Sequence, residues 1–130
     1  MSAQQYPLYR ALELLHKWYL PIGNKMPKLE ALQNLGREFQ RNLLEATTAC
    51  SVAIKTPPNK PESRIELMDM MAWHLDVCRT TINLLYEFSS EKGQTIRVIS
   101  KMQYENFLEK MEDINGQLSG WRKKTASSIK

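Results

Sequence analysis

The side chains best suited to hold a metal ion are few and far apart in the sequence. His74 and Cys78 are four residues apart, a spacing that places both on one helix face and suits zinc, and Cys50 and His16 would have to complete a tetrahedral set. No short ligand pair occurs elsewhere in the chain, and a lone buried cysteine is usually a packing residue. We therefore expect no metal site.

The motifs of the common enzyme classes are also missing. Glu13 and His16 form one Glu-x-x-His pair, but a di-iron bundle needs that motif on two helices together with two more glutamates. The chain has no GxGxxG or Walker pattern to hold a nucleotide phosphate, and no arrangement of Ser, His and Asp stands out. We expect a protein that is not an enzyme, with no catalytic residues and no cofactor.

The remaining candidates are basic side chains, which could bind a nucleic acid or a polymerase that holds a nucleic acid. They can form a sequence-independent phosphate-binding surface. The alternative is solvated helix surface in which Glu38 and Glu45 pair locally with some of them. The candidate contact residues are Lys17, Lys25, Lys28, Arg37, Arg41, Arg79, Arg122, Lys123 and Lys124.

The charge that these residues contribute is unevenly distributed. The chain of 130 residues has 18 Lys and Arg against 14 Asp and Glu, a net charge of +4. Residues 1–61 hold 8 basic and 4 acidic side chains, whereas residues 62–130 hold 10 of each, so the whole excess lies in the first half. A mildly basic chain is compatible with a polyanionic partner without identifying one.

Composition restricts the class of protein further. With 42% apolar and 25% charged residues, the chain suits one globular domain rather than a disordered segment. No apolar run is long enough to span a membrane, and Met1 to Gln5 lack the apolar core of a signal peptide. Cys50 and Cys78 are far apart, so we expect a reduced cytoplasmic protein.

Helical periodicity over the first half predicts two of the elements that must position these residues. The first, about 6–26, steps by threes and fours through Leu8, Leu12, Leu15, Tyr19 and Ile22, with a kink expected at Pro21. The second, about 28–55, places one apolar stripe on Leu32, Leu35, Phe39, Leu43, Ala46, Cys50 and Ala53. The proline-rich segment 56–61 is the clearest loop.

Two further helices are predicted in the second half. One runs over about 63–89 and begins at a capping box of Ser63 and Glu66; the other runs over about 100–124 and begins at a capping box of Ser100 and Gln103. Gly93 is a turn or helix-stop residue between them, and 95–99 is β-branched but has no evident partner strand, so we expect a connection there. The stripe of the last helix is Tyr104, Phe107, Met111, Ile114, Leu118 and Trp121.

Four amphipathic helices joined by short loops predict an all-α, single-domain fold, the up-and-down four-helix bundle. The last residues, about 125–130, are expected to form a flexible basic tail.

The third helix has two apolar faces, whereas a bundle helix needs only one. The first face holds Met68, Met71, Leu75, Cys78, Ile82 and Leu85. Almost opposite, at 100° per residue, lie Met70, Trp73, Val77, Leu84 and Phe88. Either the helix is sunk centrally in its own bundle, or the second face packs on another copy of the chain. Arg79 is expected toward the first face, either in an ion pair or snorkelling, or in a groove that binds phosphate or a partner.

Short motifs in this chain are similar to those of a known family. Residues 18–28 contain Tyr19-Leu20-Pro21-Ile22 followed by Pro27-Lys28, and 118–123 contain Gly120-Trp121 with a basic end. Leu75 followed by Arg79 also matches. Over roughly residues 8–124 the chain resembles the accessory variability determinant of diversity-generating retroelements, a four-helix-bundle family related to ribosomal RNA intervening-sequence proteins.

The resemblance implies a barrel-like homopentamer of bundles with a basic surface that binds nucleic acid. It also implies association with the retroelement reverse transcriptase, which makes mutagenised cDNA from a template RNA. Arg79 matches a basic position of the family, while Asn83, one turn on, stands where a second basic residue is expected.

The sequence therefore predicts a non-enzymatic accessory subunit that holds template RNA or cDNA near the reverse transcriptase, with no membrane partner. Two alternatives stay open. One is a ribosomal-RNA-associated bundle without a reverse transcriptase, and the other is a purely structural homo-oligomeric bundle whose basic surface has no role.

Overall fold

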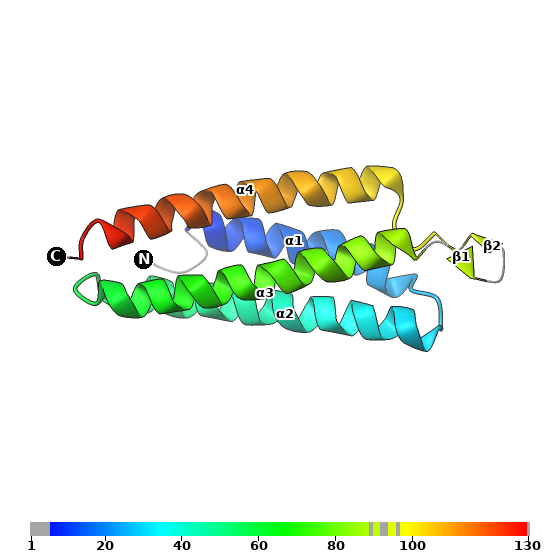
Figure 1. Cartoon of the computed structure of the whole chain (residues 1–130), viewed down its shortest axis with the longest axis horizontal. Coiled ribbons are helices and arrows are strands. Elements are labelled where there is room, and N and C mark those ends of the chain that lie inside the picture. Colours follow the sequence, from blue (N-terminus) through cyan, green and yellow to red (C-terminus); the bar gives the residue numbers. More distant parts are fainter. Residues whose placement is uncertain (1–5, 89, 92–93, 96, 130) are drawn as a thin grey trace.

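The computed structural model describes residues 6–88, 90–91, 94–95 and 97–129. Its helices are α1 (Pro7–Asn24), α2 (Glu30–Lys55), α3 (Pro61–Glu87) and α4 (Lys101–Ala126). They lie alternately up and down, as Figure 1 shows, and both termini lie at the end where α2 passes into α3. The predicted all-α four-helix bundle is confirmed. No helix in the described ranges has the length and apolar character needed to cross a membrane.

Each helix packs on its neighbours in sequence, and α1 also packs on α4, which closes the bundle. α1 and α3 lie diagonally opposite each other, as do α2 and α4. At 1.5 Å per residue, the longest helices extend about 40 Å. We call the two ends of the bundle by what lies there: the terminus end, where α4 ends and α2 meets α3, and the hairpin end, where α1 meets α2.

Helix starts follow local chemistry in two different ways. Proline occupies the first turn of α1 and of α3, where its missing N–H costs nothing. α4 begins at the predicted capping box: Ser100 Oγ accepts from the Gln103 N–H at 3.0 Å, and Gln103 Oε1 accepts from the Ser100 N–H at 2.8 Å. The capping box predicted at Ser63 and Glu66 is wrong, because α3 already begins at Pro61 and Ser63 lies inside it.

Other boundaries differ from the prediction by a few residues. α1 continues through Pro21 to Asn24, and α2 begins at Glu30. The segment between α3 and α4 is not merely a connection, because β1 (Ser90–Glu91) pairs antiparallel with β2 (Gln94–Thr95). Gly93 lies outside the described residues. α4 extends to Ala126, and Thr125 is buried, so the helix includes the start of the expected tail.

The apolar stripes meet in one core. All five predicted stripe residues of α1 are buried, and on α3 the whole first face is buried. An aromatic cluster joins three helices at mid-height, with ring centroids of Tyr19 and Phe39 at 4.8 Å and of Trp18 and Phe107 at 5.1 Å. The Trp18 indole also donates to the carbonyl of Gln103 at 3.1 Å, which ties α1 to the start of α4. Packing in this core fixes the rotation of each helix about its own axis and thereby determines which residues face the solvent.

Candidate nucleic-acid and subunit interfaces

All nine basic candidates are exposed, but the bundle separates them into three groups. Lys25 and Lys28 lie at the hairpin end, within the segment that connects α1 to α2. Arg122, Lys123 and Lys124 lie at the terminus end, in the last turns of α4, where cations also suit the helix dipole. The structure therefore does not bring the predicted residues together into one patch.

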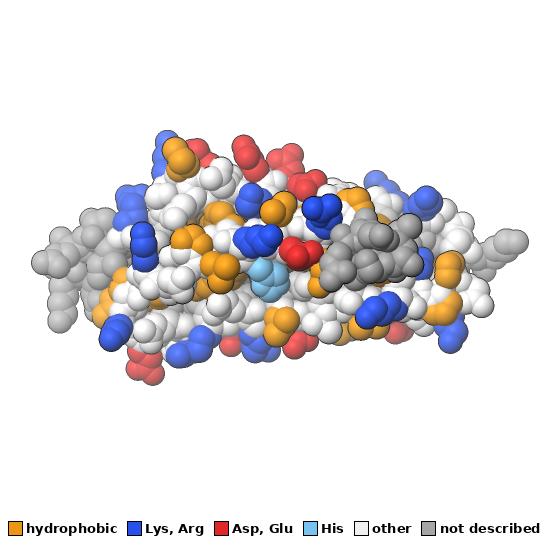
Figure 2. Space-filling model, turned by 180° about the vertical axis from the view of Figure 1, so that it is seen from behind, with side chains coloured by type: hydrophobic (Ala, Val, Ile, Leu, Met, Phe, Trp, Pro, Cys, Tyr) orange, Lys and Arg blue, Asp and Glu red, His pale blue; other side chains and the backbone are white. Residues whose placement is uncertain are grey.

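The third group lies at mid-height on three helices and consists of Lys17 on α1, Arg37 and Arg41 on α2, and Arg79 on α3. The Cys78 thiol donates to the carbonyl of Phe39 at 3.6 Å, so Arg79, the next residue of α3, lies at about the same height along the bundle as Arg37 and Arg41. Lys17 lies on the helix diagonally opposite α3. Figure 2 likewise shows Lys and Arg side chains spread along the whole rear face, with acidic side chains along both its upper and its lower edge.

Arg79 does not form, with any described residue, the ion pair within the bundle that was one of the arrangements expected for it. Its side chain is exposed, and no carboxylate in the described ranges pairs with it. The methylene stem of an arginine can lie along an apolar helix surface while its guanidinium group reaches the solvent. Asn83, one turn on, accepts a hydrogen bond from the Tyr104 hydroxyl at 2.6 Å and so serves the α3–α4 contact.

Two of the nine candidates are engaged in ion pairs within the chain. Arg41 Nη2 lies 2.8 Å from Glu38 Oε2, and Arg122 Nε lies 2.8 Å from Asp69 Oδ1. The hydrogen bond from Arg41 holds the pKa of Glu38 below its usual value, and the hydrogen bond from Arg122 does the same for the pKa of Asp69. Local pairing, the alternative interpretation of the basic residues, thus applies to Arg41 and Arg122. Among the described residues it does not extend to the other seven.

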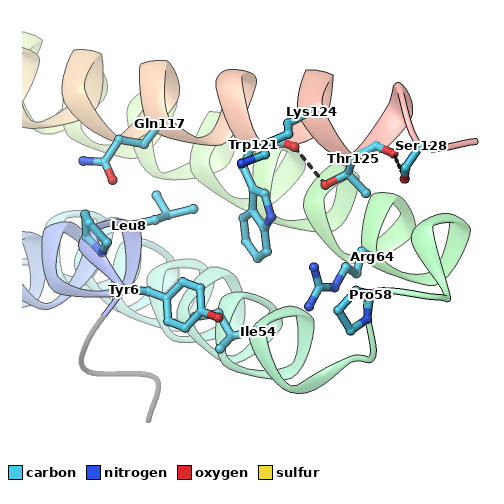
Figure 3. A pocket seen from close by; sticks show the side chains of 11 residues that line it. Tyr6, Leu8, Ile54, Pro58, Arg64, Gln117, Trp121, Lys124, Thr125 and Ser128 are labelled. Atoms are coloured by element: carbon cyan, nitrogen blue, oxygen red, sulfur yellow. Dashed lines mark hydrogen bonds between the residues drawn. The ribbon is translucent and has the colours of Figure 1, made fainter. Parts of the chain in front are cut away.

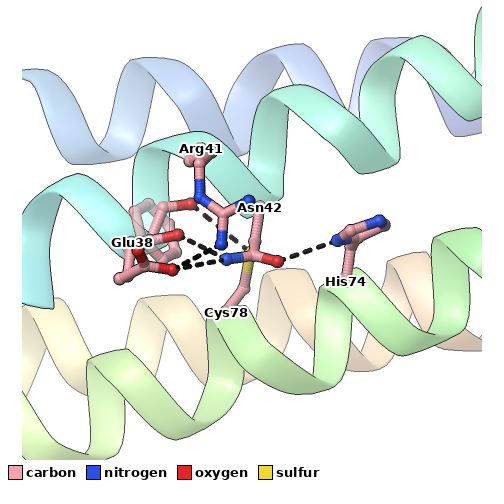
Figure 4. A network of polar contacts seen from close by, with 6 residues as sticks. Glu38, Arg41, Asn42, His74 and Cys78 are labelled. Atoms are coloured by element: carbon pink, nitrogen blue, oxygen red, sulfur yellow. Dashed lines mark hydrogen bonds and ion pairs between the residues drawn. The ribbon is translucent and has the colours of Figure 1, made fainter.

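Buried polar residues link α2 to α3 near Arg41, as Figure 4 shows. Asn42 Nδ2 donates to the carbonyl of Glu38 at 2.8 Å, and Asn42 Oδ1 lies 2.8 Å from Nδ1 of His74. Because an amide oxygen only accepts, His74 must carry a proton on Nδ1. His74 is therefore a structural partner of α2 in this chain, with its ring oriented by Asn42.

The other potential metal ligands also have protein partners. His16 Nε2 lies 3.0 Å from Thr47 Oγ1, whose own proton is donated to the carbonyl of Leu43 at 2.7 Å, so His16 donates. Burial raises the pKa of the Cys50 and Cys78 thiols to about 12, which disfavours the thiolate that metals need. Among the described residues, no group of three or more His, Cys, Asp or Glu side chains could hold a metal ion.

The second apolar face of α3 is uncovered. Trp73 is 67% exposed, Phe88 53% and Met70 48%, while Val77 and Leu84 are half-buried. A helix sunk centrally in its own bundle would have buried these side chains, so that alternative is wrong for the single chain. Other helices also expose single apolar residues, such as Leu44 on α2, but Trp73 and Phe88 are the aromatic ones.

One feature escaped the sequence analysis. A cavity of about 470 Å³ opens at the terminus end, between the start of α1, the α2–α3 loop and the end of α4. Its walls come from three stretches that are distant in sequence, 6–8, 54–64 and 117–128, so no motif marks it. Trp121 is predicted from the sequence only as a stripe residue. Comparisons with protein family models, with curated proteins and with solved structures found no match.

Proposed function

We propose that the protein is a non-enzymatic accessory subunit of a retroelement reverse transcriptase, which binds template RNA or cDNA as a homo-oligomer, with a pentamer expected from the family resemblance. The observation that carries the nucleic-acid part is the set of exposed basic side chains that have no ion pair with a described carboxylate: Lys17, Lys25, Lys28, Arg37, Arg79, Lys123 and Lys124. Unpaired cations on a surface release counterions from a phosphate backbone when they bind it.

The spread of these groups supports an assembly rather than a single binding patch. One chain has a net charge of only +4, distributed over both ends and the middle of the bundle. Several copies joined through Met70, Trp73, Val77, Leu84 and Phe88 would repeat each group around the particle. A nucleic acid that wraps the particle would then meet phosphate-binding groups at regular intervals.

Salt-dependent binding tests the nucleic-acid part directly. Fluorescence anisotropy of a labelled single-stranded RNA should give an affinity that falls linearly with the logarithm of the KCl concentration, with a slope of about −0.7 per phosphate contacted. Arg79→Gln should reduce both affinity and slope. Arg41→Gln is the matched control on the neighbouring helix, and it should have a smaller effect because Glu38 already offsets that charge.

Absence of binding at low salt would overturn the nucleic-acid part and leave a purely structural bundle. The partner is tested separately by co-purification of the tagged chain with a co-expressed retroelement reverse transcriptase, with and without ribonuclease treatment. Recovery of the polymerase in both conditions supports a direct protein contact. No recovery in either condition would contradict the accessory role.

A further inference from the structure

The cavity at the terminus end combines an aromatic wall with cations. Figure 3 shows the Trp121 ring reaching into it from α4, with Tyr6 on one side and Arg64 and Pro58 on the other. Both aromatic residues are half-buried, so each keeps part of its ring available to a ligand. The side chains that matter for recognition are Tyr6, Pro58, Arg64, Gln117, Trp121 and Lys124.

The Arg64 guanidinium is held in place by the end of α2. Its Nε donates to the carbonyl of Thr56 at 2.8 Å, which also satisfies one of the last carbonyls of that helix. This bond uses one N–H of the fork and leaves the Nη groups to interact with a ligand. A cation oriented in this way loses little side-chain entropy when an anion binds.

The charge of the cavity is of one sign. Lys124 is the second cation of the wall, and none of the described residues that line the cavity is acidic. The other polar groups are neutral: the Gln117 amide, and the hydroxyls of Thr125 and Ser128, which donate to backbone carbonyls and keep lone pairs free to accept. The cavity therefore favours a flat apolar ligand with an anionic group and disfavours a cation.

We propose that this cavity binds one unstacked nucleotide of a single strand, with the base stacked on Trp121 and its phosphate near Arg64 and Lys124. This inference rests on the proposed function and adds a site to it. The volume of about 470 Å³ is that of an ordinary small-ligand site and accommodates a base with its sugar. Gln117 donates one amide N–H to Asp113 Oδ1 at 3.1 Å, and its second N–H and its Oε1 are left for the edge of the base. Such a site distinguishes unpaired from paired nucleic acid, since a base inside a duplex cannot enter.

The first test compares single-stranded RNA with a duplex of the same sequence by fluorescence anisotropy. Trp121→Leu should weaken single-strand binding about tenfold, within the usual range for loss of one stacked base, and leave duplex binding unchanged. Met102→Ala is the control, because it removes a highly exposed side chain from the other end of the same helix. Equal losses for both substrates, or no loss in Trp121→Leu, would overturn the site while leaving the proposed function intact.

A second variant keeps the test decisive if Trp121→Leu does not fold. Lys124→Glu changes an exposed side chain, and Lys101→Glu makes the same change at the hairpin end. Only Lys124→Glu should abolish the preference for single strands over duplex. An equal effect of the two variants would mean that the cation acts only through the general field of the surface, and the site would be overturned.

Uridine 5′-monophosphate is the probe that distinguishes a nucleotide within an RNA strand from a free nucleotide as the ligand of the cavity. Equilibrium dialysis of the full chain with this probe should show weak binding that Trp121→Leu removes. If the chain binds no RNA at low salt but binds the monophosphate through Trp121, the proposed function fails and the cavity is a site for free nucleotide. If neither RNA nor the monophosphate binds, both proposals fail.

Discussion

The two faces of α3 are both apolar but have opposite surroundings. On the inner face, Met68, Met71 and Leu75 are fully buried among residues of the other helices. On the outer face, Met70 and Trp73 lie within the same turns of helix but face away from the chain's own core. Hydrophobic side chains stabilise a fold only where the chain covers them, so the inner face contributes to folding, whereas the outer face stays exposed and is the surface proposed for contact with other copies.

The largest expected effect comes from the inner face. Leu75→Ala removes a fully buried side chain and leaves a cavity in the core, so it should lower the free energy of unfolding by about 3 kcal/mol. Urea denaturation followed by circular dichroism measures this loss. Met70→Ala, on the outer face of the same helix, is the control and should change it by less than about 1 kcal/mol. Equal losses would contradict the distinction between the two faces.

A second contrast between inside and outside concerns glycine. A Cβ at Gly36 would clash with the Tyr19 hydroxyl, whereas a Cβ at Gly116 meets nothing within 4 Å. Gly36→Ala should therefore destabilise the bundle by about 1–3 kcal/mol through overpacking. Gly116→Ala should stabilise it by about 0.5–1 kcal/mol, since alanine is the better helix former. The two substitutions should shift the melting temperature in opposite directions, downward for Gly36→Ala and upward for Gly116→Ala. A higher melting temperature for Gly36→Ala would contradict the overpacking and show that the Tyr19 side chain moves aside.

Acidification should weaken the fold through a half-buried group before the exposed ion pairs respond. Burial lowers the pKa of His16 below its usual 6.5, only partly opposed by Glu13. The unfolded chain therefore binds the proton more readily, so stability is complete above about pH 6.5 and falls as the pH drops toward the folded pKa. Thermal melts at pH 7.5 and 5.5 should show a lower Tm at the acidic pH.

His16→Gln is the control for this pH effect, because glutamine can still donate a hydrogen bond toward Thr47. The variant should lose part of the difference in Tm between the two pH values. If the difference in Tm between pH 7.5 and 5.5 is unchanged in this variant, the pH effect comes from other groups. The pKa values of the carboxylates Glu38 and Asp69 are lowered in the folded chain. Their contribution to stability is therefore lost at a more acidic pH, as the pH falls below the pKa of an ordinary carboxyl group toward their folded pKa values.

The smallest effect on folding is expected on the outer face. Trp73→Asp should leave the helical circular dichroism signal of the chain unchanged, because the side chain contacts little of its own core. The substitution should nevertheless dissociate the particle into monomers, since a carboxylate in an apolar subunit contact is strongly unfavourable. Multi-angle light scattering measures the resulting mass. Leu44→Asp places the same charge at an exposed position of α2 and should leave the mass unchanged. A wild-type mass for Trp73→Asp would contradict the assignment of this face.

Much of the fold could be read from local patterns. The periodic stripes of α1 and α4 identify buried residues, and the capping box at Ser100 marks the start of a helix, because both depend on residues within a few positions of each other. The start of α3 was misplaced because two local signals competed there: proline at the first helical position prevailed over Ser63 and Glu66. The pairing of β1 with β2 had no pattern strong enough to predict it.

The candidate sites depended on the tertiary structure to a greater extent. The sequence by itself determined the four amphipathic helices, the excess of basic residues in the first half and the doubly apolar third helix, because periodicity and charge are properties of neighbouring residues. Only the tertiary structure decided that the outer face of α3 stays uncovered, that Arg79 is exposed and that the basic residues form three separate groups. It alone assembled the cavity around Trp121, since which distant segments meet is fixed by how the helices pack.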